Sequence, residues 1–311
     1  MGRLASIDGV ICPPEEAKVS VYDRGFLYGD SVFETVRTYS GEPFALDEHL
    51  TRLERSAERV AIAVPIPAAD LALEIRRVVR AARNAESSAR VMLSRGSGPL
   101  GLDPNLAVKP LRVVLVEPLT PLPTALYRDG IAVITVLTQR AVDATAYAQG
   151  AKVGNYLASL LALRDAKAAG AHEALILDAA GHVLEGTTSN LFVVEPARGQ
   201  SSAGAGAALI TPPLEAGILA GITRAHVMEV AGELGVLVRS EPITTTRLAV
   251  ADEVFITSTL REILPVVRVD GRLVGGGAPG PVTRSLHAAF RRKVGMGAEP
   301  LPWEAADPLP P

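Results

Sequence analysis

Residues 151–161 read AKVGNYLASLL, and residues 181–194 read GHVLEGTTSNLFVV. The first stretch places Lys152 directly before an apolar run of helical character, and the second places Glu185 at the end of a strand-turn-strand pattern. Alone, such a lysine is usually a solvated surface charge, and such a glutamate is usually a turn residue. Their significance depends on the chemistry that the two side chains offer together and on the motifs around them.

An amine and a carboxylate are the two groups that the ring of pyridoxal phosphate requires of a protein. The Lys152 amine would capture the cofactor aldehyde if burial or nearby cations let it lose its proton near neutral pH. The Glu185 carboxylate would keep the ring nitrogen protonated, so that the ring withdraws electrons from a carbanion. This pair of residues indicates chemistry on amino acids.

The length and charge of the chain narrow the class of protein. Its 311 residues exceed the usual size of one domain, so we expect two domains. A net charge of -3 and the lack of a basic patch argue against a nucleic-acid partner. Cys12 is the only cysteine, which excludes an intrachain disulfide and a cysteine-rich metal site, and we expect no metal. Because no signal peptide and no run of about 18 apolar residues is visible, we expect a cytoplasmic protein without a membrane partner.

Proline and glycine divide the sequence into segments. Residues 20–117 alternate short strand patterns with amphipathic helices, and residues 118–130, PLTPLPTALYRDG, interrupt any periodic pattern. We expect a small N-terminal α/β domain over 1–118, an interdomain loop over 119–130, a large C-terminal cofactor-binding domain over 131–295 and a proline-rich tail over 296–311. Within the large domain the patterns predict a helix from residue 155, a hairpin around 269–274 and a last helix near 282–293.

Three segments offer donors for a phosphate group. Gly221 precedes Ile222 and Thr223 at the start of a helical pattern, where main-chain N–H groups can approach an anion. Thr257–Thr259 end a strand with hydroxyl groups, and Arg52 lies off the apolar stripe of a helix. Each segment also has a plain structural interpretation, because glycine can serve packing, threonine is common at strand ends, and a helix arginine is commonly exposed.

These motifs together resemble the class IV, fold type IV, pyridoxal-phosphate aminotransferases, the family of branched-chain aminotransferases, D-amino acid aminotransferases and aminodeoxychorismate lyases. The resemblance covers residues 20–293, and the motifs that carry it follow the family's order: YGDSVFETVR, EHLTRL, AKVGNYL, EGTTSNLF, ITPP with GILAGITR, and ADEVFITST followed by LPVVRVDGR. It implies an α/β (α+β) fold of type IV. A smaller N-terminal α/β domain would precede a larger C-terminal domain with a β-barrel-like core flanked by helices.

The resemblance also implies roles for individual residues. Lys152 would form the internal aldimine and shuttle a proton between the substrate α-carbon and the cofactor C4′. Glu185 would pair with the pyridine nitrogen, and Tyr156 would hydrogen-bond the phenolic oxygen. The phosphate would be held by Arg52, the main chain of Ile222 and Thr223, and Thr259. Because the family's site is completed by a neighbouring subunit, a homodimer or larger assembly is implied.

Two segments are similar to those of the branched-chain enzymes: the loop SRGSGPLGLDP and the tyrosine of AKVGNYL. D-amino acid enzymes have an Arg and a His in this loop to grip the substrate carboxylate, and Leu100 and Leu102 occupy the matching positions here. An apolar substrate pocket is therefore implied, with candidate residues Tyr28, Phe33, Leu100, Tyr127 and Leu260, and with Arg90 as a support for the carboxylate. Strand-like alternation also fits a simple core role for Tyr28 and Phe33, and Arg37 fits an ion-pair partner as readily as a site residue.

One segment departs from the branched-chain pattern, which has Thr followed by two small residues and Glu. Here Thr259 is followed by Leu260, Arg261 and Glu262. Either the two bulky residues reshape the carboxylate pocket, or Arg261 binds an acidic group directly. The FETVR segment likewise differs from the FEGIR of branched-chain enzymes.

We therefore predict a transaminase that moves an amino group between L-valine, L-leucine or L-isoleucine and 2-oxoglutarate. D-amino acid or (R)-amine transamination and the aminodeoxychorismate lyase reaction are alternatives on the same fold. A non-enzymatic cofactor-binding protein is a further alternative, but such a protein would be expected to lose Lys152, Glu185 or Tyr156.

Overall fold

The computed structural model describes residues 2–107, 109–137, 149–196 and 206–304. Contacts divide the chain into two compact units, Met1–Thr120 with Thr145–Tyr156, and Pro121–Ala144 with Leu157–Pro311. In this division the segment that carries Lys152 packs with the first unit rather than with the rest of 131–295. Each unit is described by itself below.

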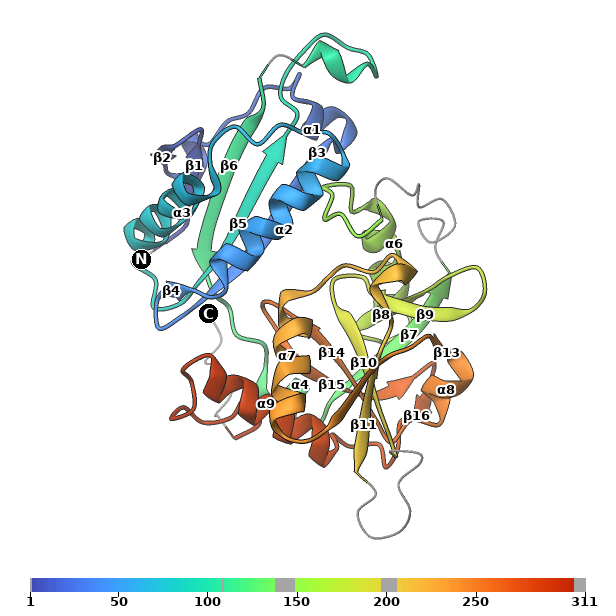
Figure 1. Cartoon of the computed structure of the whole chain (residues 1–311). Helices are drawn as coiled ribbons and strands as arrows, with labels where there is room; N and C mark the ends of the chain where they lie inside the picture. Colours follow the sequence, from blue (N-terminus) through green and yellow to red (C-terminus); the bar gives the residue numbers. More distant parts are fainter. Residues whose placement is uncertain (1, 108, 138–148, 197–205, 305–311) are drawn as a thin grey trace. The chain divides into compact units, whose positions relative to one another are not determined.

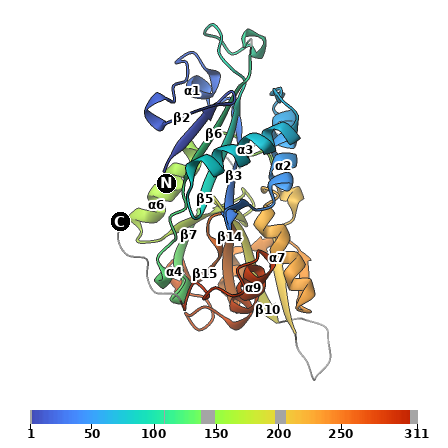
Figure 2. The same ribbon diagram turned by 90° about the vertical axis from the view of Figure 1, so that its left-hand side faces the viewer.

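The first unit is built on a six-stranded antiparallel sheet with the strand order β2-β1-β6-β5-β3-β4. Its elements are β1 (Leu4–Ile7), β2 (Val10–Cys12), η1 (Pro14–Glu16), α1 (Arg24–Tyr28), β3 (Ser31–Tyr39), β4 (Glu42–Pro43), α2 (Leu46–Arg59), α3 (Ala68–Ala82), β5 (Ser87–Ser94), η2 (Pro104–Leu106) and β6 (Leu111–Pro118). Figures 1 and 2 show α2 and α3 on the same face of this sheet.

The helix α2 forms because apolar residues recur along one side of it. Leu46, Leu50, Leu53 and Ala57 are all buried, and they pack with α3 and the sheet in one hydrophobic core. Each fully buried leucine contributes about 1.5 to 3 kcal/mol relative to an exposed one. The same packing fixes the direction in which Arg52, between two of these leucines, leaves the helix.

The second unit is built on a ten-stranded sheet with the order β12-β11-β10-β14-β15-β7-β8-β9-β13, in which β16 pairs with β15. The strands are β7 (Ile131–Leu137), β8 (Glu173–Leu177), β9 (His182–Gly186), β10 (Asn190–Pro196), β11 (Ala207–Thr211), β12 (Leu237–Ser240), β13 (Ile243–Thr244), β14 (Glu253–Ser258), β15 (Glu262–Val269) and β16 (Arg272–Leu273). The helices are α4 (Thr124–Arg128), α6 (Leu157–Ala168), η3 (Leu214–Ala216), α7 (Ile222–Glu233), α8 (Thr245–Ala249) and α9 (Pro281–Lys293).

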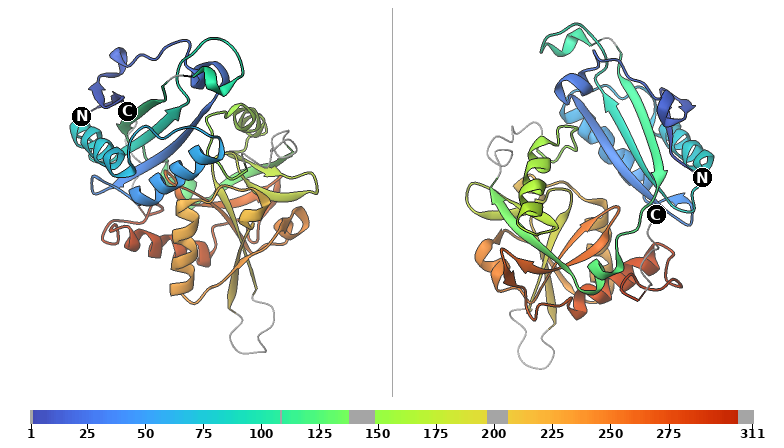
Figure 3. Two further views of the ribbon diagram at one scale, coloured as in Figure 1. Left: turned by 45° about the horizontal axis from the view of Figure 1, so that its top comes forward. Right: turned by 180° about the vertical axis from the view of Figure 1, so that it is seen from behind.

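This second sheet is mixed, since β7 runs parallel to both β8 and β15 while β14 is antiparallel to its neighbours. Figure 3 shows the sheet curled rather than flat, which agrees with the predicted barrel-like core flanked by helices. Its inner face carries a core that includes Leu191, Ile210 and Ile256. On the outside, α6 packs its alanines Ala162 and Ala166 against β7 and β8.

The predicted hairpin and last helix are confirmed, because β15 pairs with β16 and α9 spans Pro281–Lys293. The helix expected from residue 155 starts at Leu157 instead. Its first predicted turn is not helical because the segment before it is extended, with Val153 in a bridge to Val32 of β3. Of the expected tail, residues 305–311 lie outside the described residues, whereas Trp303 packs on the second core with its ring centroid 5.4 Å from that of His287.

Candidate active site

The main chain of Lys152 is fixed against β3 and α2 in the first unit. Its N–H donates to the Ser56 hydroxyl at 3.1 Å, and its carbonyl accepts from Phe33 N at 3.0 Å. Gly154 N donates to Ser31 O at 2.7 Å, and a Cβ at Gly154 would lie 2.1 Å from the Ser31 hydroxyl oxygen, which only glycine avoids. Both main-chain polar groups of Lys152 are therefore hydrogen-bonded, although the residue lies outside any helix or strand.

The amine of Lys152 lies among aromatic groups. Its Nζ is 3.3 Å from the Tyr156 hydroxyl oxygen and 4.6 Å from the centroid of the Phe33 ring. The Phe33 and Tyr156 rings meet edge to face at 5.3 Å, and Phe33 is buried. The structure therefore places an amine, a phenol and an apolar wall together, and Phe33 has a core role as well as a contact with the candidate site.

Arg52 is buried, with 8% of its surface exposed, so the exposed-helix interpretation is wrong. Its guanidinium holds Glu34 of β3 through two hydrogen bonds of 2.7 Å, one from Nε and one from Nη2. His49 contacts the same carboxylate at 2.7 Å. Burial alone would raise the pKa of Glu34, but the bonds from Arg52 and His49 outweigh it and lower that pKa to about 2. Burial lowers the pKa of His49 despite the nearby carboxylate, so this imidazole is held neutral at pH 7.

Arg90 and Arg37 of the first unit stack on aromatic rings. Arg90 of β5 is exposed, and its Cζ lies 4.5 Å from the centroid of the Phe33 ring. It therefore shares Phe33 with Lys152. Arg37 stacks instead on Tyr39, with its Cζ 4.1 Å from that ring centroid.

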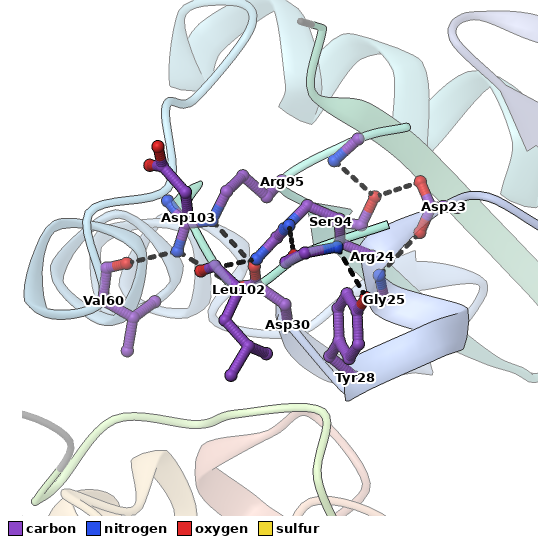
Figure 4. A network of polar contacts seen from close by, with 12 residues as sticks. Asp23, Arg24, Gly25, Tyr28, Asp30, Val60, Ser94, Arg95, Leu102 and Asp103 are labelled. Atoms are coloured by element: carbon purple, nitrogen blue, oxygen red, sulfur yellow. Dashed lines mark hydrogen bonds and ion pairs between the residues drawn. The ribbon is translucent and has the colours of Figure 1, made fainter. Parts of the chain in front are cut away.

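The loop that carries Leu100 is tied to α1 by a polar network, shown in Figure 4. Asp30 accepts hydrogen bonds from Arg24 Nε at 3.0 Å and from Arg95 Nε at 2.8 Å. Burial would raise the pKa of Asp30, but the bonds from Arg95 and Arg24 lower it. Arg24 Nη1 also donates to Gly101 O at 2.8 Å, so a side chain of α1 bonds the loop directly.

The two substrate candidates on this network point outward within the first unit. Leu100 is 69% exposed, and Tyr28 is 37% exposed, so a simple core role for Tyr28 is wrong. The Tyr28 hydroxyl accepts a hydrogen bond from Gly101 N at 3.3 Å, and Arg24 stacks on its ring. Neither side chain is brought against Lys152 in the described contacts of this unit.

In the second unit, Glu185 is the last residue but one of β9, and it contacts the segment that leads into α7. Its Oε2 accepts from Leu219 N at 3.0 Å and from Asn190 Nδ2 at 3.4 Å. The Asn190 amide also donates to Leu219 O at 2.9 Å, so one side chain joins the strand to this loop. A Cβ at Gly221 would lie 1.8 Å from Asn190 Oδ1. The residue directly before α7 therefore has to be a glycine, which has no Cβ.

The start of α7 presents donors for an anion. No side chain caps this twelve-residue helix at Gly221, and its first residues, Ile222 and Thr223, are buried. On the strand opposite Asn190, the buried hydroxyl of Thr257 has no hydrogen-bond partner among the described residues. An unpartnered hydroxyl and an uncapped helix start near a carboxylate fit a phosphate-bearing cofactor better than they fit a closed core.

The turn after β14 carries the remaining candidates. Thr259 is half-buried and Leu260 is 38% exposed. Arg261 is committed to a carboxylate of its own unit, because its Nη1 lies 2.6 Å from Glu173 Oε2. The Tyr127 hydroxyl donates to Arg261 O at 3.1 Å, so this candidate wall residue fixes the turn.

Apart from Tyr28 and Leu100, the candidates are sorted into two groups by the unit in which they lie. The first group contains Lys152, Tyr156, Phe33, Arg90 and Arg52. The second contains Glu185, Ile222, Thr223, Tyr127, Thr259 and Leu260.

Three polar residues in these groups escaped sequence reasoning: Glu34, Asn190 and Glu173. A usable signal existed for Glu34, since a charge within an apolar strand run is rarely buried without a partner.

Elsewhere in the second unit, a cleft of about 460 Å³ is lined by Thr135, Leu248 and Asp270 among others, and it shares no lining residue with the candidates. Across the described residues, no group of three or more His, Cys, Asp or Glu is placed to hold a metal ion, and no helix there has the length and apolarity that crossing a membrane takes.

Comparison with known proteins places these features in a family. The family model of amino-transferase class IV matches residues 31–269. A putative branched-chain-amino-acid aminotransferase of Methanocaldococcus jannaschii is 39% identical over 92% of this chain and 94% of its own length. A D-alanine aminotransferase of Bacillus licheniformis is 31% identical over 92% of this chain and 95% of its own.

The fold agrees with solved structures as well. The branched-chain amino acid aminotransferase of Escherichia coli has a TM-score of 0.87 at 32% identity, covering 97% of this chain and 98% of its own. A match of this extent, together with the family model, covers both groups of candidate residues. The chain therefore belongs to the class IV aminotransferases and is a transaminase of branched-chain aminotransferase type in its fold.

Proposed function

We propose that this protein uses pyridoxal phosphate to move an amino group between an L-branched-chain amino acid (valine, leucine or isoleucine) and 2-oxoglutarate. The observation that carries the proposal is the Lys152 amine, which is 3.3 Å from the Tyr156 hydroxyl and faces the Phe33 ring. When bound, the cofactor supplies an aldehyde for the donor's nitrogen and a ring that withdraws electrons from the α-carbon. The amine of Lys152 would take the proton from the substrate α-carbon, and the Tyr156 hydroxyl, 3.3 Å from Nζ, would orient that amine.

The other residues hold and tune the cofactor in this proposal. Glu185 would pair with the ring nitrogen, and two donors, Leu219 N and Asn190 Nδ2, hold its carboxylate in place. The phosphate is assigned to the start of α7 at Ile222 and Thr223, with Thr259 and Arg52 as further donors.

Substrate choice follows from the apolar and charged groups near Lys152. The Phe33 ring favours an apolar side chain, and the exposed Arg90 above the same ring is suited to the second carboxylate of 2-oxoglutarate. Arg261 is paired with Glu173, so an acidic group would have to compete with that carboxylate for it. Small-molecule amino and oxo acids are thus the proposed partners, in a reducing compartment such as the cytoplasm.

The rival assignment is D-amino acid transamination on the same fold, favoured by the D-alanine aminotransferase relative. We expect L-leucine to bleach the visible absorbance of the cofactor-loaded protein at least about 100-fold faster than D-alanine, because Leu100 and Leu102 offer no cation to the carboxylate of a D-amino acid. Stopped-flow spectrophotometry of single half-reactions measures these rates. If D-alanine reacts faster than L-leucine, the protein is a D-amino acid transaminase and the proposal is wrong.

A homodimer is also proposed, with α6 as part of its interface. Leu157, Leu160 and Leu161 of α6 are 63%, 61% and 43% exposed, although the opposite side of the helix is already packed. Three adjacent exposed leucines on one helix are typical of a surface covered by another chain. A second copy is the proposed occupant because the resemblance implies a site completed by a neighbouring subunit.

We expect Leu160→Glu to shift the protein from dimer to monomer, because the carboxylate would have to be buried in an apolar interface. Sedimentation velocity at several protein concentrations measures the shift. Leu73→Glu is the matched control, since Leu73 of α3 is 63% exposed and lies outside the proposed interface. Equal association of both variants would exclude α6 from the interface.

A further inference from the structure

Arg261 joins two turns of the second unit that are far apart in the sequence. Its Nε donates to Ser258 Oγ at the end of β14, 3.0 Å away, and its Nη1 lies 2.6 Å from Glu173 Oε2. Its Nη2 donates to the Thr188 carbonyl at 3.4 Å and contacts the Thr188 hydroxyl. Every nitrogen of the guanidinium is therefore engaged within the protein.

Glu173 is the centre of this arrangement. It begins β8 and is only 1% exposed, so its charge must be satisfied by nearby donors. Thr187 N donates to its Oε1 at 3.0 Å, and the Thr187 hydroxyl contacts the same oxygen. Among the described residues, Arg261 is the cation that forms an ion pair with this carboxylate.

The two joined turns are the ones that carry cofactor candidates. Thr187 and Thr188 follow Glu185 by two and three residues, and Thr259 lies between Ser258 and Arg261. The main chain of the second turn is fixed further by the Tyr127 hydroxyl on Arg261 O. His287 holds Glu262 at 2.7 Å, and Glu262 has a positive φ of 57°, a conformation that side chains other than glycine rarely adopt.

We propose that Arg261 is a positioning residue that acts through Glu173 to lock the turn after Glu185 to the turn of Thr259, so that ring and phosphate donors keep a fixed spacing. This inference rests on the proposed use of pyridoxal phosphate. It removes Arg261 from the residues that bind an acidic substrate, because binding one would break the pair with a buried carboxylate. Leu260, at the exposed tip of the locked turn, is left to face the substrate.

The test compares Arg261→Met with Arg247→Met. Arg247 lies in the same unit and is also held by carboxylates, Glu195 at 2.6 and 3.0 Å and Glu241 at 2.9 Å. Glu195 lies five residues along β10 from Asn190, roughly 16 Å away at the usual strand rise, so this pair serves as a matched control. Two readouts are used: the dissociation constant of pyridoxal phosphate, and hydrogen exchange of peptides covering 185–190 and 258–262 in the cofactor-free protein.

We expect Arg261→Met to weaken cofactor binding at least about tenfold and to speed exchange in both peptides, as loss of an orienting contact usually does. Arg247→Met should change neither. If Arg261→Met misfolds, the double variant Glu173→Gln with Arg261→Met removes both charges of the pair. This variant should melt near the wild-type temperature yet still bind cofactor weakly. Arg261→Lys should recover only part of the cofactor affinity. The single ammonium group of lysine cannot make the separate hydrogen bonds that the three guanidinium nitrogens make to Ser258, Glu173 and Thr188.

Two results would overturn the proposal. One is cofactor affinity and exchange in Arg261→Met that match those of Arg247→Met. The other is unchanged cofactor affinity with a raised KM for 2-oxoglutarate alone, which would make Arg261 a substrate ligand. A wild-type protein that binds no pyridoxal phosphate would defeat the proposed function, whereas the exchange data would still report whether Arg261 locks the two turns.

Discussion

A Lys152→Ala variant is expected to lose the visible absorbance of the cofactor-loaded protein and to transfer no measurable amino group from any donor. The methyl group of alanine cannot form the covalent bond to the cofactor aldehyde, nor can it carry the α-proton. Proton transfer by a placed side chain contributes about 10²–10⁴-fold, so with the covalent step lost as well the rate should fall below detection. Absorbance spectra and a leucine half-reaction measure both effects.

The control for this variant is Lys167→Ala, because Lys167 is an exposed lysine in the last turn of α6. Lys167→Ala should keep both the visible absorbance of the cofactor-loaded protein and the rate of the leucine half-reaction. Added methylamine should restore part of the rate to Lys152→Ala, since the main chain of residue 152 stays fixed by Ser56 and Phe33 and leaves space where the amine stood. A visible band that survives in Lys152→Ala would show that the covalent attachment lies elsewhere.

Sequence patterns predicted the elements well where periodicity was strong. The apolar spacing of Leu50, Leu53 and Ala57 predicts α2, and the VDGRLV turn predicts the pairing of β15 with β16. The start of α6 was misplaced because helix propensity at residues 155 and 156 gives way to a bridge between Val153 and Val32, a contact that local sequence does not encode.

The sequence indicated which residues to consider for the candidate site, but not which side chains those residues contact. Lys152 and Tyr156 are four residues apart, so their meeting at 3.3 Å follows from a short segment. Arg52 was uncertain from the sequence because its orientation depends on Glu34, which lies eighteen positions away on a strand. Arg261 was ambiguous for the same reason, since the carboxylate that holds it is 88 positions away. Buried charges reveal their partners only once the tertiary fold is known.

A Glu34→Gln variant is expected to lose about 3 to 5 kcal/mol of stability in the first unit at pH 7, because it leaves the buried Arg52 without its counter-charge. The pKa of Glu34 is lowered to about 2 from 4.5, so its contribution is fully present above pH 4.5 and is lost as pH falls from 4.5 toward 2. That shift corresponds to roughly 3 kcal/mol. His49 acts in the same direction below pH 6.5, since its lowered pKa means that protonation favours the unfolded chain.

The gap between wild type and Glu34→Gln should therefore be widest near pH 7 and should narrow by about 2 kcal/mol at pH 3. Urea titrations at the two pH values, read by hydrogen exchange of peptides from β3 and α2, report the first unit separately. Glu117→Gln is the control, because its pair with Arg3 is half exposed or more on both sides and should change stability by less than about 0.5 kcal/mol. A gap that does not depend on pH, or one as small as that of Glu117→Gln, would mean that the carboxylate of Glu34 does not hold Arg52 in solution, and the phosphate role proposed for Arg52 would lose its structural basis.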